Sequence, residues 1–350
     1  MRTVHVEASR SYDVLIGEGL LADLGSHAAA INKVRKVCIV SDSNVWPIWG
    51  SAAKNSLLDA GLDTVEFIFP AGEPSKNTAT YLNLLNFLAE NRLTRTDLIV
   101  ALGGGVVGDL AGFAAATYLR GISFIQVPTT LLAAVDSSVG GKTAIDLPAG
   151  KNLVGAFYQP ALVLCDTDCL NTLPEEIFRD GCSEVIKYGV LYDPELFAHL
   201  AENGLDFDRE AVITRCVELK RDVVAEDEFD TGARMKLNLG HTFGHGVEAR
   251  SNYEISHGRA VAIGMAIVAR AGEKRRICES AAKDAVLDIL RKFSLPFSCD
   301  FDADSLFACA LSDKKRSGGE VNLIVPERIG FCRTVPTAVE DMKAFIEAGL

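Results

Sequence analysis

Short apolar segments alternate with helical patterns through the first half of the chain, and this alternation limits the possible folds more than any other feature. Four of these segments have the length of a strand and stop at an acid, a glycine or a proline: 36–42, 64–69, 97–102 and 122–127. Such an alternation is typical of a mostly parallel sheet covered by helices. Because the loops after parallel strands meet at one edge of the sheet, we expect them to form a single ligand crevice.

Long amphipathic patterns replace this alternation from about residue 173. They predict helices at 174–191, 194–203, 209–228, 258–278 and 281–293. Pro174 and Pro194 stand where the first turn of a helix tolerates proline. We therefore predict an α/β N-terminal domain with a parallel sheet at 1–165, followed by a mostly α-helical C-terminal domain at 166–350.

The composition excludes two classes of partner. The chain has a net charge of −12 and a pI near 5.1, whereas nucleic acids and anionic membranes are bound by positively charged surfaces. The N-terminal residues lack the apolar stretch of a signal peptide, and the nine scattered cysteines contain no Cys-x-x-Cys pair. We expect a cytoplasmic protein with buried thiols; the alternative is a metal or redox role for Cys165 and Cys169.

A glycine-rich segment, 103–109, follows the third predicted strand and opens a predicted helix. Its G-x-G-x-x-G spacing lets the backbone approach a pyrophosphate, and the first N–H groups of the helix can bind the negative charge. The alternative is a tight turn without a ligand. Asp42 ends an earlier strand and could accept from a ribose hydroxyl, although the acid normally follows the glycines. Segment 72–76, which contains Glu73 and Lys76, is either an exposed loop or a further ribose or phosphate contact.

The polar segment 128–143 resembles a phosphate-binding loop. Its Gly-Gly-Lys-Thr end is not a Walker motif, because the position that requires glycine is Asp136, so we exclude an ATPase or GTPase of that class. Lys151 and Asn152 follow nine residues after Lys142, and two lysines and an amide can therefore converge on one anion. Cations that cluster in a closed site require a bound anion or nearby acids. The alternative is a solvated charged loop.

Half of the six histidines fall within a short segment, at His241, His245 and His257. His241 and His245 have the i, i+4 spacing of metal-binding pairs on a helix. No glutamate follows His241, so the His-Glu-x-x-His motif of zinc proteases is absent. Glu184 stands in an otherwise apolar helical pattern and could supply a carboxylate ligand; the alternative is an i, i+3 ion pair with Lys187.

These segments together resemble the 3-dehydroquinate synthases, and the resemblance extends over nearly the whole chain. The segments that carry it are 103–109, Arg120-Gly121, 128–142, Lys151-Asn152, Glu184 with Lys187, and 237–245. The resemblance implies an NAD-binding α/β domain, a helical metal-binding domain, an active site between the domains and a homodimer. It also implies a divalent metal, Zn²⁺ or Co²⁺, held by Glu184, His241 and His257, so that His245 becomes a proton-handling neighbour of the ligands.

The resemblance further implies two sets of contacts. The NAD contacts would be Asp42, Glu73, Lys76, Gly105, Val106, Val107, Gly108, Asp109, Thr129, Thr130, Lys142, Lys151, Cys169, Leu170, Asn171 and Thr172. The substrate contacts would be Asp136, Lys142, Asn152, Lys187, Lys220, Arg234, Asn238, His245 and one of Lys314 or Lys315. Arg120 would reach the site of the neighbouring subunit. The chain departs from many relatives at Asp146, where they have asparagine.

The implied activity converts 3-deoxy-D-arabino-heptulosonate 7-phosphate into 3-dehydroquinate and phosphate, a step of the shikimate pathway. It combines transient oxidation by NAD, β-elimination of phosphate, reduction and an intramolecular aldol closure. One alternative is a related sugar-phosphate cyclase with another substrate. A second is a metal-dependent polyol dehydrogenase, which would not need so many cations. A third, an inactive NAD-binding regulatory protein, is disfavoured by the complete set of ligand candidates and lysines.

Overall fold

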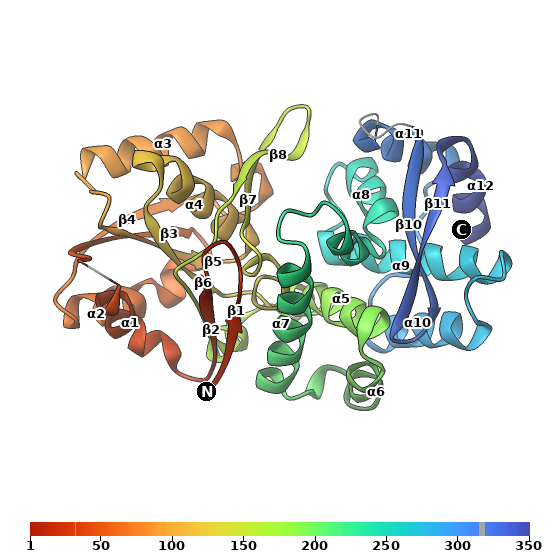
Figure 1. The fold of residues 1–350 in the computed structure, drawn as a ribbon, viewed down its shortest axis with the longest axis horizontal. Helices are drawn as coiled ribbons and strands as arrows, with labels where there is room; N and C mark the ends of the chain where they lie inside the picture. The colour runs from red at the N-terminus through yellow and green to blue at the C-terminus, as the bar shows by residue number, and fades with distance from the viewer. Residues whose placement is uncertain (32, 315–318) are drawn as a thin grey trace. The chain divides into compact units, whose positions relative to one another are not determined.

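The computed structural model describes residues 1–31, 33–314 and 319–350, with the side chains of 309–314 outside this description. The chain folds into two compact units (Figure 1). The first comprises 1–174 and 209–229, and the second comprises 175–208 and 230–350. Within the described residues, no helix combines the length and the apolar character needed to cross a membrane.

The first unit is built on a seven-stranded sheet with the strand order β1-β2-β9-β6-β5-β3-β4. The strands are β1 (Arg2–Val6), β2 (Tyr12–Gly17), β3 (Lys36–Asp42), β4 (Asp63–Phe69), β5 (Leu98–Gly103), β6 (Ser123–Pro128) and β9 (Leu162–Asp166). All neighbours pair in parallel except β1 and β2, which form an antiparallel hairpin at one edge. The predicted parallel α/β architecture is confirmed.

Helices cover both faces of this sheet (Figure 1). Leucines of α1 (Leu24–Ala30) and α2 (Ser51–Asp59) pack on one face, and α3 (Thr78–Glu90) and α4 (Gly105–Thr117) pack on the other. Strand β5 is therefore buried on both faces, which explains its continuous apolar sequence. A separate hairpin joins β7 (Lys142–Leu147) to β8 (Gly150–Phe157).

The second unit is mostly helical, as predicted. Its helices are α5 (Glu175–Tyr192), α6 (Pro194–Asn203), α8 (His241–Arg250), α9 (His257–Lys274), α10 (Ser280–Lys292), α11 (Ala303–Lys314) and α12 (Val339–Gly349). Helix α9 is buried along most of its length and contacts α5, α8, α10 and α12, so it is the core helix of this unit. A hairpin of β10 (Glu320–Arg328) and β11 (Phe331–Ala338) was not predicted.

The boundary between the units differs from the predicted division at 165/166. Helix α7 (Arg209–Glu226), predicted to lie in the second domain, belongs to the first unit because its side chains bind there. The ammonium of Lys220 donates to Asp136, and Glu228, just after α7, accepts from Ser9. The segment after β9 also stays with the first unit, because Asp166 accepts from the N–H of Leu21.

Short 3-10 or π-helical turns connect the main elements. They are η1 (Leu20–Asp23), η2 (Trp46–Gly50), η3 (Glu73–Ser75), η4 (Tyr118–Arg120), η5 (Ala133–Ser137), η6 (Thr167–Thr172), η7 (Gly204–Asp206) and η8 (Ala233–Asn238). Several of the predicted site residues lie in these turns, at the ends of strands and before helices.

Candidate active site

The predicted nucleotide contacts of the first unit gather at one edge of the sheet. Strands β9, β6, β5, β3 and β4 are consecutive neighbours and all parallel, so their carboxyl ends point the same way. Asp42 ends β3, Thr129 follows β6, and Glu73 lies in the turn after β4. The Gly-rich segment follows β5, and η6 with Cys169 follows β9. Ligands of open α/β sheets bind at this edge.

The Gly-rich turn leads directly into α4. Gly104 precedes the helix and offers no side-chain cap, so the first N–H groups of α4 can receive an anion. A Cβ on Gly108 would lie 2.5 Å from the side-chain oxygen of Gln126, so a larger residue here would require this side chain to move. The hydroxyl of Thr129 is buried and has no hydrogen-bond partner among the described residues, as expected of an atom that binds a ligand.

Three of the predicted NAD contacts also have structural roles. One carboxylate oxygen of Asp42 accepts from the N–H groups of Asn44 and Val45, at 2.8 and 3.0 Å, and so shapes the loop after β3. In η6, Cys169 is fully buried, and Thr172 accepts a hydrogen bond from the indole N–H of Trp49. Any contribution of Cys169 to a nucleotide site would therefore come from its backbone.

The two closest cysteines are packing residues. Cys165 and Cys169 are 1% and 0% exposed, and burial raises the pKa of both thiols, that of Cys165 to about 12. A thiol that stays protonated is a poor metal ligand and a poor nucleophile. The expectation of buried, unreactive thiols is confirmed for this pair.

Lys76 is the centre of a polar group at the same edge. It is 4% exposed, and its ammonium lies 2.5 Å from a carboxylate oxygen of Asp109 on α4 and 2.6 Å from the side-chain oxygen of Asn152 on β8. Burial opposes the charged form, but the charges of Asp109 and Glu73 outweigh it and raise the pKa of Lys76. Glu73 also lies 3.4 Å from the ammonium of Lys151. Lys76 and Lys151 each therefore have an acid beside them.

Asp146 holds the backbone of Asn152 in a strained conformation. Asn152 has a φ of 55°, a region that residues other than glycine rarely adopt. Its N–H donates to the carboxylate of Asp146 at 2.7 Å, and the N–H of Asp146 donates to the carbonyl of Lys76 at 2.8 Å. An asparagine at position 146 could supply the same oxygen acceptor, so the departure at Asp146 keeps this contact.

Four predicted substrate or subunit contacts lie elsewhere in the first unit. The ammonium of Lys220 donates to the backbone and carboxylate oxygens of Asp136, at 2.6 and 2.7 Å. Lys142 begins β7 and is exposed. Arg120 is exposed at the end of η4, where it and Leu119 have φ values of 68° and 50°. Two consecutive left-handed residues are uncommon and are found most often where function requires them.

The second unit brings Glu184, His241 and His257 together. The Nε2 atoms of His241 and His257 lie 3.4 and 3.3 Å from the same oxygen of Glu184. Glu184 is fully buried on α5, whereas the histidines are the first residues of α8 and α9. Lys187 forms an ion pair with Glu184, so the i, i+3 ion pair predicted as the alternative role of this acid is also present. Two imidazole nitrogens and a carboxylate are a ligand set that Zn²⁺ accepts.

The two histidines differ in their electrostatics. Burial lowers the pKa of His241 to about 3, so this imidazole is neutral, as a ligand must be. Burial also acts against the charged form of His257, but hydrogen bonds to Glu184 and Glu248 dominate and raise its pKa to about 10. A metal bound at His257 would therefore replace a proton.

Each of these imidazoles has a hydrogen-bond partner on its other nitrogen. Nδ1 of His241 donates to the carbonyl of Leu239 at 3.0 Å, and Nδ1 of His257 lies 3.2 Å from a carboxylate oxygen of Glu248. Partners of this kind orient metal-binding histidines. Glu248 was not identified from the sequence, although it follows His241 and His245 at the i, i+4, i+7 positions of one helix face.

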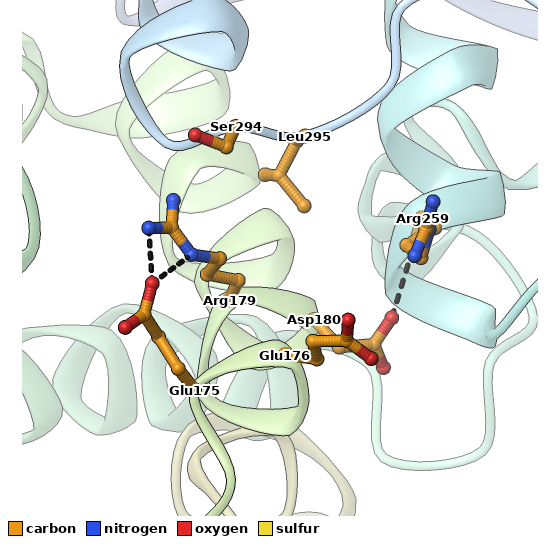
Figure 2. Close-up of a pocket in the computed structure, with 7 residues that line it drawn as sticks. All are labelled: Glu175, Glu176, Arg179, Asp180, Arg259, Ser294 and Leu295. Atoms are coloured by element: carbon orange, nitrogen blue, oxygen red, sulfur yellow. Dashed lines mark hydrogen bonds and ion pairs between the residues drawn. The ribbon is translucent and has the colours of Figure 1, made fainter.

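Asp180 fixes the start of α9 against α5. One of its carboxylate oxygens accepts from the hydroxyl of Ser256 at 2.5 Å and from the N–H of Arg259 at 2.9 Å, as Figure 2 shows for Arg259. A Cβ on Gly258 would lie 2.0 Å from the carbonyl oxygen of Asp180, so the helices meet backbone to backbone. This contact sets the position of His257. A pocket lies beside it and has seven lining residues, none of them among the predicted site residues (Figure 2).

Other predicted site residues of the second unit lie on α8, in η8 and at the end of α11. His245 is exposed on α8, with its ring centroid 5.5 Å from that of His241. Arg234, which is buried, and Asn238 lie in η8, the turn that precedes His241. Lys314 ends α11 with its side chain outside the described part of the chain, and Lys315 lies outside the described residues altogether.

Comparison with known families covers both units. Residues 66–180 match the family described as 3-dehydroquinate synthase N-terminal, and residues 181–316 match 3-dehydroquinate synthase C-terminal. The chain belongs to the 3-dehydroquinate synthase family. A 3-dehydroquinate synthase of Clostridium acetobutylicum is 44% identical over 339 residues, which are 95% of each chain. That of Enterococcus faecalis is 42% identical over 344 residues, 97% of this chain and 96% of the relative.

Solved structures of related enzymes share the fold of the 3-dehydroquinate synthase family. A 2-deoxy-scyllo-inosose synthase complexed with carbaglucose-6-phosphate, NAD⁺ and Co²⁺ has a TM-score of 0.90 and 28% identity over the whole of both chains. A 2-epi-5-epi-valiolone synthase from Streptomyces hygroscopicus with NAD⁺ and Zn²⁺ bound has a TM-score of 0.88 and 27% identity over 98% of each chain. An iron-containing alcohol dehydrogenase, at 16% identity and a TM-score of 0.70, shares the fold over 97% of each chain.

Proposed function

We propose that this chain catalyses the 3-dehydroquinate synthase reaction and forms 3-dehydroquinate and phosphate from 3-deoxy-D-arabino-heptulosonate 7-phosphate. Relatives of that name at 44% and 42% identity, aligned over nearly the whole chain, support the proposal. The observation that carries it is the convergence of two imidazole Nε2 atoms on one oxygen of Glu184. The enzyme depends on NAD and on a divalent metal, both of which are bound in the related cyclase structures.

Glu184, His241 and His257 would hold the metal, Zn²⁺ or Co²⁺. When bound, it supplies a Lewis acid that lowers the pKa of a substrate hydroxyl. Lys187, buried and paired with Glu184, balances the acid and is suited to hold an oxygen of the substrate nearby. His245 is exposed beside the ligand candidates and can pass a proton between substrate and solvent.

NAD would bind at the carboxyl edge of the sheet, where the first turn of α4 faces the pyrophosphate and Thr129 has a hydroxyl to donate. When bound, it supplies reversible hydride transfer. Lys76 and Asp109 form the fixed part of this edge, since each holds the other in place. Asp42 lies at the end of β3, within the same row of strand ends, and can meet a ribose.

The phosphate of the substrate would meet Asn152 and Lys142. The side-chain oxygen of Asn152 accepts from Lys76, so its NH₂ group is directed away from this lysine and can donate to a phosphate oxygen. Lys142 adds a positive charge, as would Lys314 or Lys315. These donors stabilise the charge that develops as phosphate leaves. We propose Asp136, Lys220, Arg234 and Asn238 as further contacts to the hydroxyl and carboxylate groups of the substrate.

The test of this function is the balance between phosphate and NADH. With catalytic amounts of NAD, phosphate should appear one for one with product, and net NADH should stay near zero because each hydride is returned. Chelation of the metal should abolish turnover. Sustained accumulation of NADH without phosphate release would contradict the proposal and favour a polyol dehydrogenase.

A related sugar-phosphate cyclase is the second candidate, and the TM-score of 0.90 to a 2-deoxy-scyllo-inosose synthase is the observation that favours it. The identity of 28% to that enzyme, against 44% to a 3-dehydroquinate synthase, makes it the weaker one. Phosphate release should be compared for the heptulosonate 7-phosphate, sedoheptulose 7-phosphate and glucose 6-phosphate. Faster release of phosphate from either of the last two substrates would make the related cyclase the stronger candidate.

We also propose that the chain acts in the cytoplasm as a homodimer in which Arg120 of each subunit completes the other subunit's site. The strained backbone at Leu119 and Arg120, together with the exposure of the Arg120 side chain, supports a role beyond the subunit's own packing.

A further inference from the structure

Glu248 is a buried acid whose place in the proposed reaction has not been assigned. It lies on α8 and is 2% exposed, although a charged carboxylate is costly to bury without a partner. One of its oxygens lies 3.2 Å from Nδ1 of His257. His257 is a partner that offsets the cost of this burial.

The ring of His257 is held between two carboxylates. Nδ1 faces Glu248, and Nε2 lies 3.3 Å from Glu184. Both carboxylates can only accept, so each ring nitrogen can donate in the metal-free chain. A metal that replaces the hydrogen on Nε2 would leave the hydrogen on Nδ1 facing Glu248. His241 has the same arrangement with a neutral partner, since its Nδ1 donates to the carbonyl of Leu239. With a metal on Nε2, both imidazoles would carry their hydrogen on Nδ1, but only the Nδ1 of His257 faces a charged partner.

We propose that Glu248 is a positioning residue for His257. It fixes the Nδ1–H tautomer, orients the ring so that Nε2 faces Glu184, and increases the electron density that His257 donates to a metal. This role rests on the proposed metal site of Glu184, His241 and His257. Carboxylate partners of this kind change metal affinity by about 10–100-fold.

A different reading of the same atoms is a second metal site. His245, Glu248 and His257 also place one ligand atom each within 4.8 Å of one another. This reading requires Nδ1 of His257 to bind a metal, whereas the positioning role requires Nδ1 to donate a hydrogen to Glu248. One nitrogen cannot do both, so the readings predict different metal stoichiometries.

The experiment measures Zn²⁺ and Co²⁺ affinity of the stripped chain by competition with a chelator. Glu248→Ala should weaken binding by about 10–100-fold while the parent binds one metal per chain. Glu248→Gln keeps an oxygen acceptor without the charge, so it should restore part of the affinity. The Nδ1 hydrogen of His257, followed by NMR with isotope-labelled histidine, should exchange slowly with solvent in the parent and faster in Glu248→Ala, because the hydrogen bond to Glu248 protects it.

Asp193→Ala is the matched control. Asp193 is a buried acid of the same unit, and its side chain caps α6 by accepting from the N–H groups of Glu195 and Leu196. Its loss should lower stability by about 0.5–2 kcal/mol. Because it caps α6, which carries none of the ligand candidates, metal affinity should stay at the parent value. An equal loss of affinity in the control would reduce the effect of Glu248 to general destabilisation and overturn the positioning role.

Two other results would also overturn the proposal. One is parent-like metal affinity in Glu248→Ala. The other is two metals per parent chain with one lost in Glu248→Ala, which would establish the second metal site instead. A parent that binds no metal would sink the proposed function, and the exchange of the Nδ1 hydrogen would then decide by itself whether Glu248 holds His257.

Discussion

At the scale of single residues, most of the polar chemistry of the first unit depends on Lys76. Its ammonium connects α4 through Asp109 with the β7–β8 hairpin through Asn152, and it is almost inaccessible to solvent. A buried lysine of this kind is stable only because its acids surround it. The ammonium of Lys76 also holds the side chain of Asn152 in a position to bind an anion.

Lys76→Met should therefore weaken NAD binding by about tenfold, equivalent to ~1.4 kcal/mol, because Asp109 and Asn152 lose the group that holds them. It should also lower the free energy of unfolding by about 1–3 kcal/mol. The control is Lys54→Met, which removes a more exposed ion pair with Glu66 in the same unit and should cost less than about 1 kcal/mol. Titration with NAD and urea unfolding measure both effects, and equal results for the two variants would contradict the prediction.

Asp97 contributes to the pH dependence of stability in the first unit. It is 4% exposed and accepts from the N–H and hydroxyl of Thr94 and from the N–H of Lys36. Burial alone would raise the pKa of Asp97, but these hydrogen bonds outweigh it and hold the pKa below its usual value. A carboxyl whose pKa is lowered on folding contributes stability above its unfolded pKa of about 3.9, and this stability is lost as the pH falls through the folded pKa.

Asp97→Asn should consequently destabilise the chain by about 1–3 kcal/mol at neutral pH, because the amide nitrogen meets donors. The difference from the parent should shrink as the pH falls below about 4, because the unfolded parent then binds a proton that the folded carboxyl binds only at lower pH. Urea unfolding of both proteins across this pH range measures how the stability difference changes with pH. A difference that stays constant would show that Asp97 acts through packing rather than charge.

At the scale of elements, the metal candidates depend on how closely three helices approach. Glu184, His241 and His257 come from α5, α8 and α9, and two glycines allow the contact. A Cβ on Gly264 of α9 would lie 1.9 Å from the carbonyl oxygen of Gly240, just as Gly258 admits the carbonyl of Asp180. Backbone atoms cannot yield as a flexible side chain can, so these contacts fix the distance between the histidines.

Asp180→Ala should loosen the first turn of α9 and move His257. We expect a loss of about 0.5–2 kcal/mol in the free energy of unfolding, because the Arg259 N–H and the Ser256 hydroxyl lose their acceptor. Metal affinity should fall by about tenfold, since His257 is the first residue of this helix. Asp180→Asn keeps an oxygen acceptor and should retain most of the stability and most of the metal affinity. Chelator competition measures the affinity. Parent-like metal binding by Asp180→Ala would show that Asp180 does not influence the metal site through His257.

At the scale of the whole molecule, the proposed dimer can be tested without a structure of the assembly. Arg120→Ala and Lys142→Ala should each be inactive if both residues serve one site contributed by two subunits. Mixing the two variants should then restore up to about a quarter of the parent activity, because each heterodimer has one site with both residues intact. Heterodimers that stay inactive would place Arg120 in its own subunit's site.

The sequence predicted the first unit well because its signals are local. The bounds of β3 were predicted to the residue, and the apolar run of β5 and the glycines after it predicted a buried strand that opens a helix. The β7–β8 hairpin was missed because segment 128–143 was interpreted as one polar loop. Its first part is the π-helical turn η5, and β7 begins at Lys142.

Helix α7 shows the limit of this reasoning. Its amphipathic pattern predicted a helix correctly, at nearly its observed bounds, but the pattern does not identify the surface against which the helix packs. That was decided by the contacts of Lys220 with Asp136 and of Glu228 with Ser9, residues distant in sequence. A domain division based on sequence order could not include a helix that returns to the first unit.

The sequence by itself determined the residue types of the site: a Gly-rich turn after a strand, lysines near Asn152, and clustered histidines with one buried acid. Only the tertiary structure decided which atoms face one another. It turned Nε2 of both His241 and His257 toward Glu184, and it placed Glu248 behind His257. The physical reason is that the spacing of residues along a helix specifies a face, whereas the distance between faces is set by the packing of α5, α8 and α9.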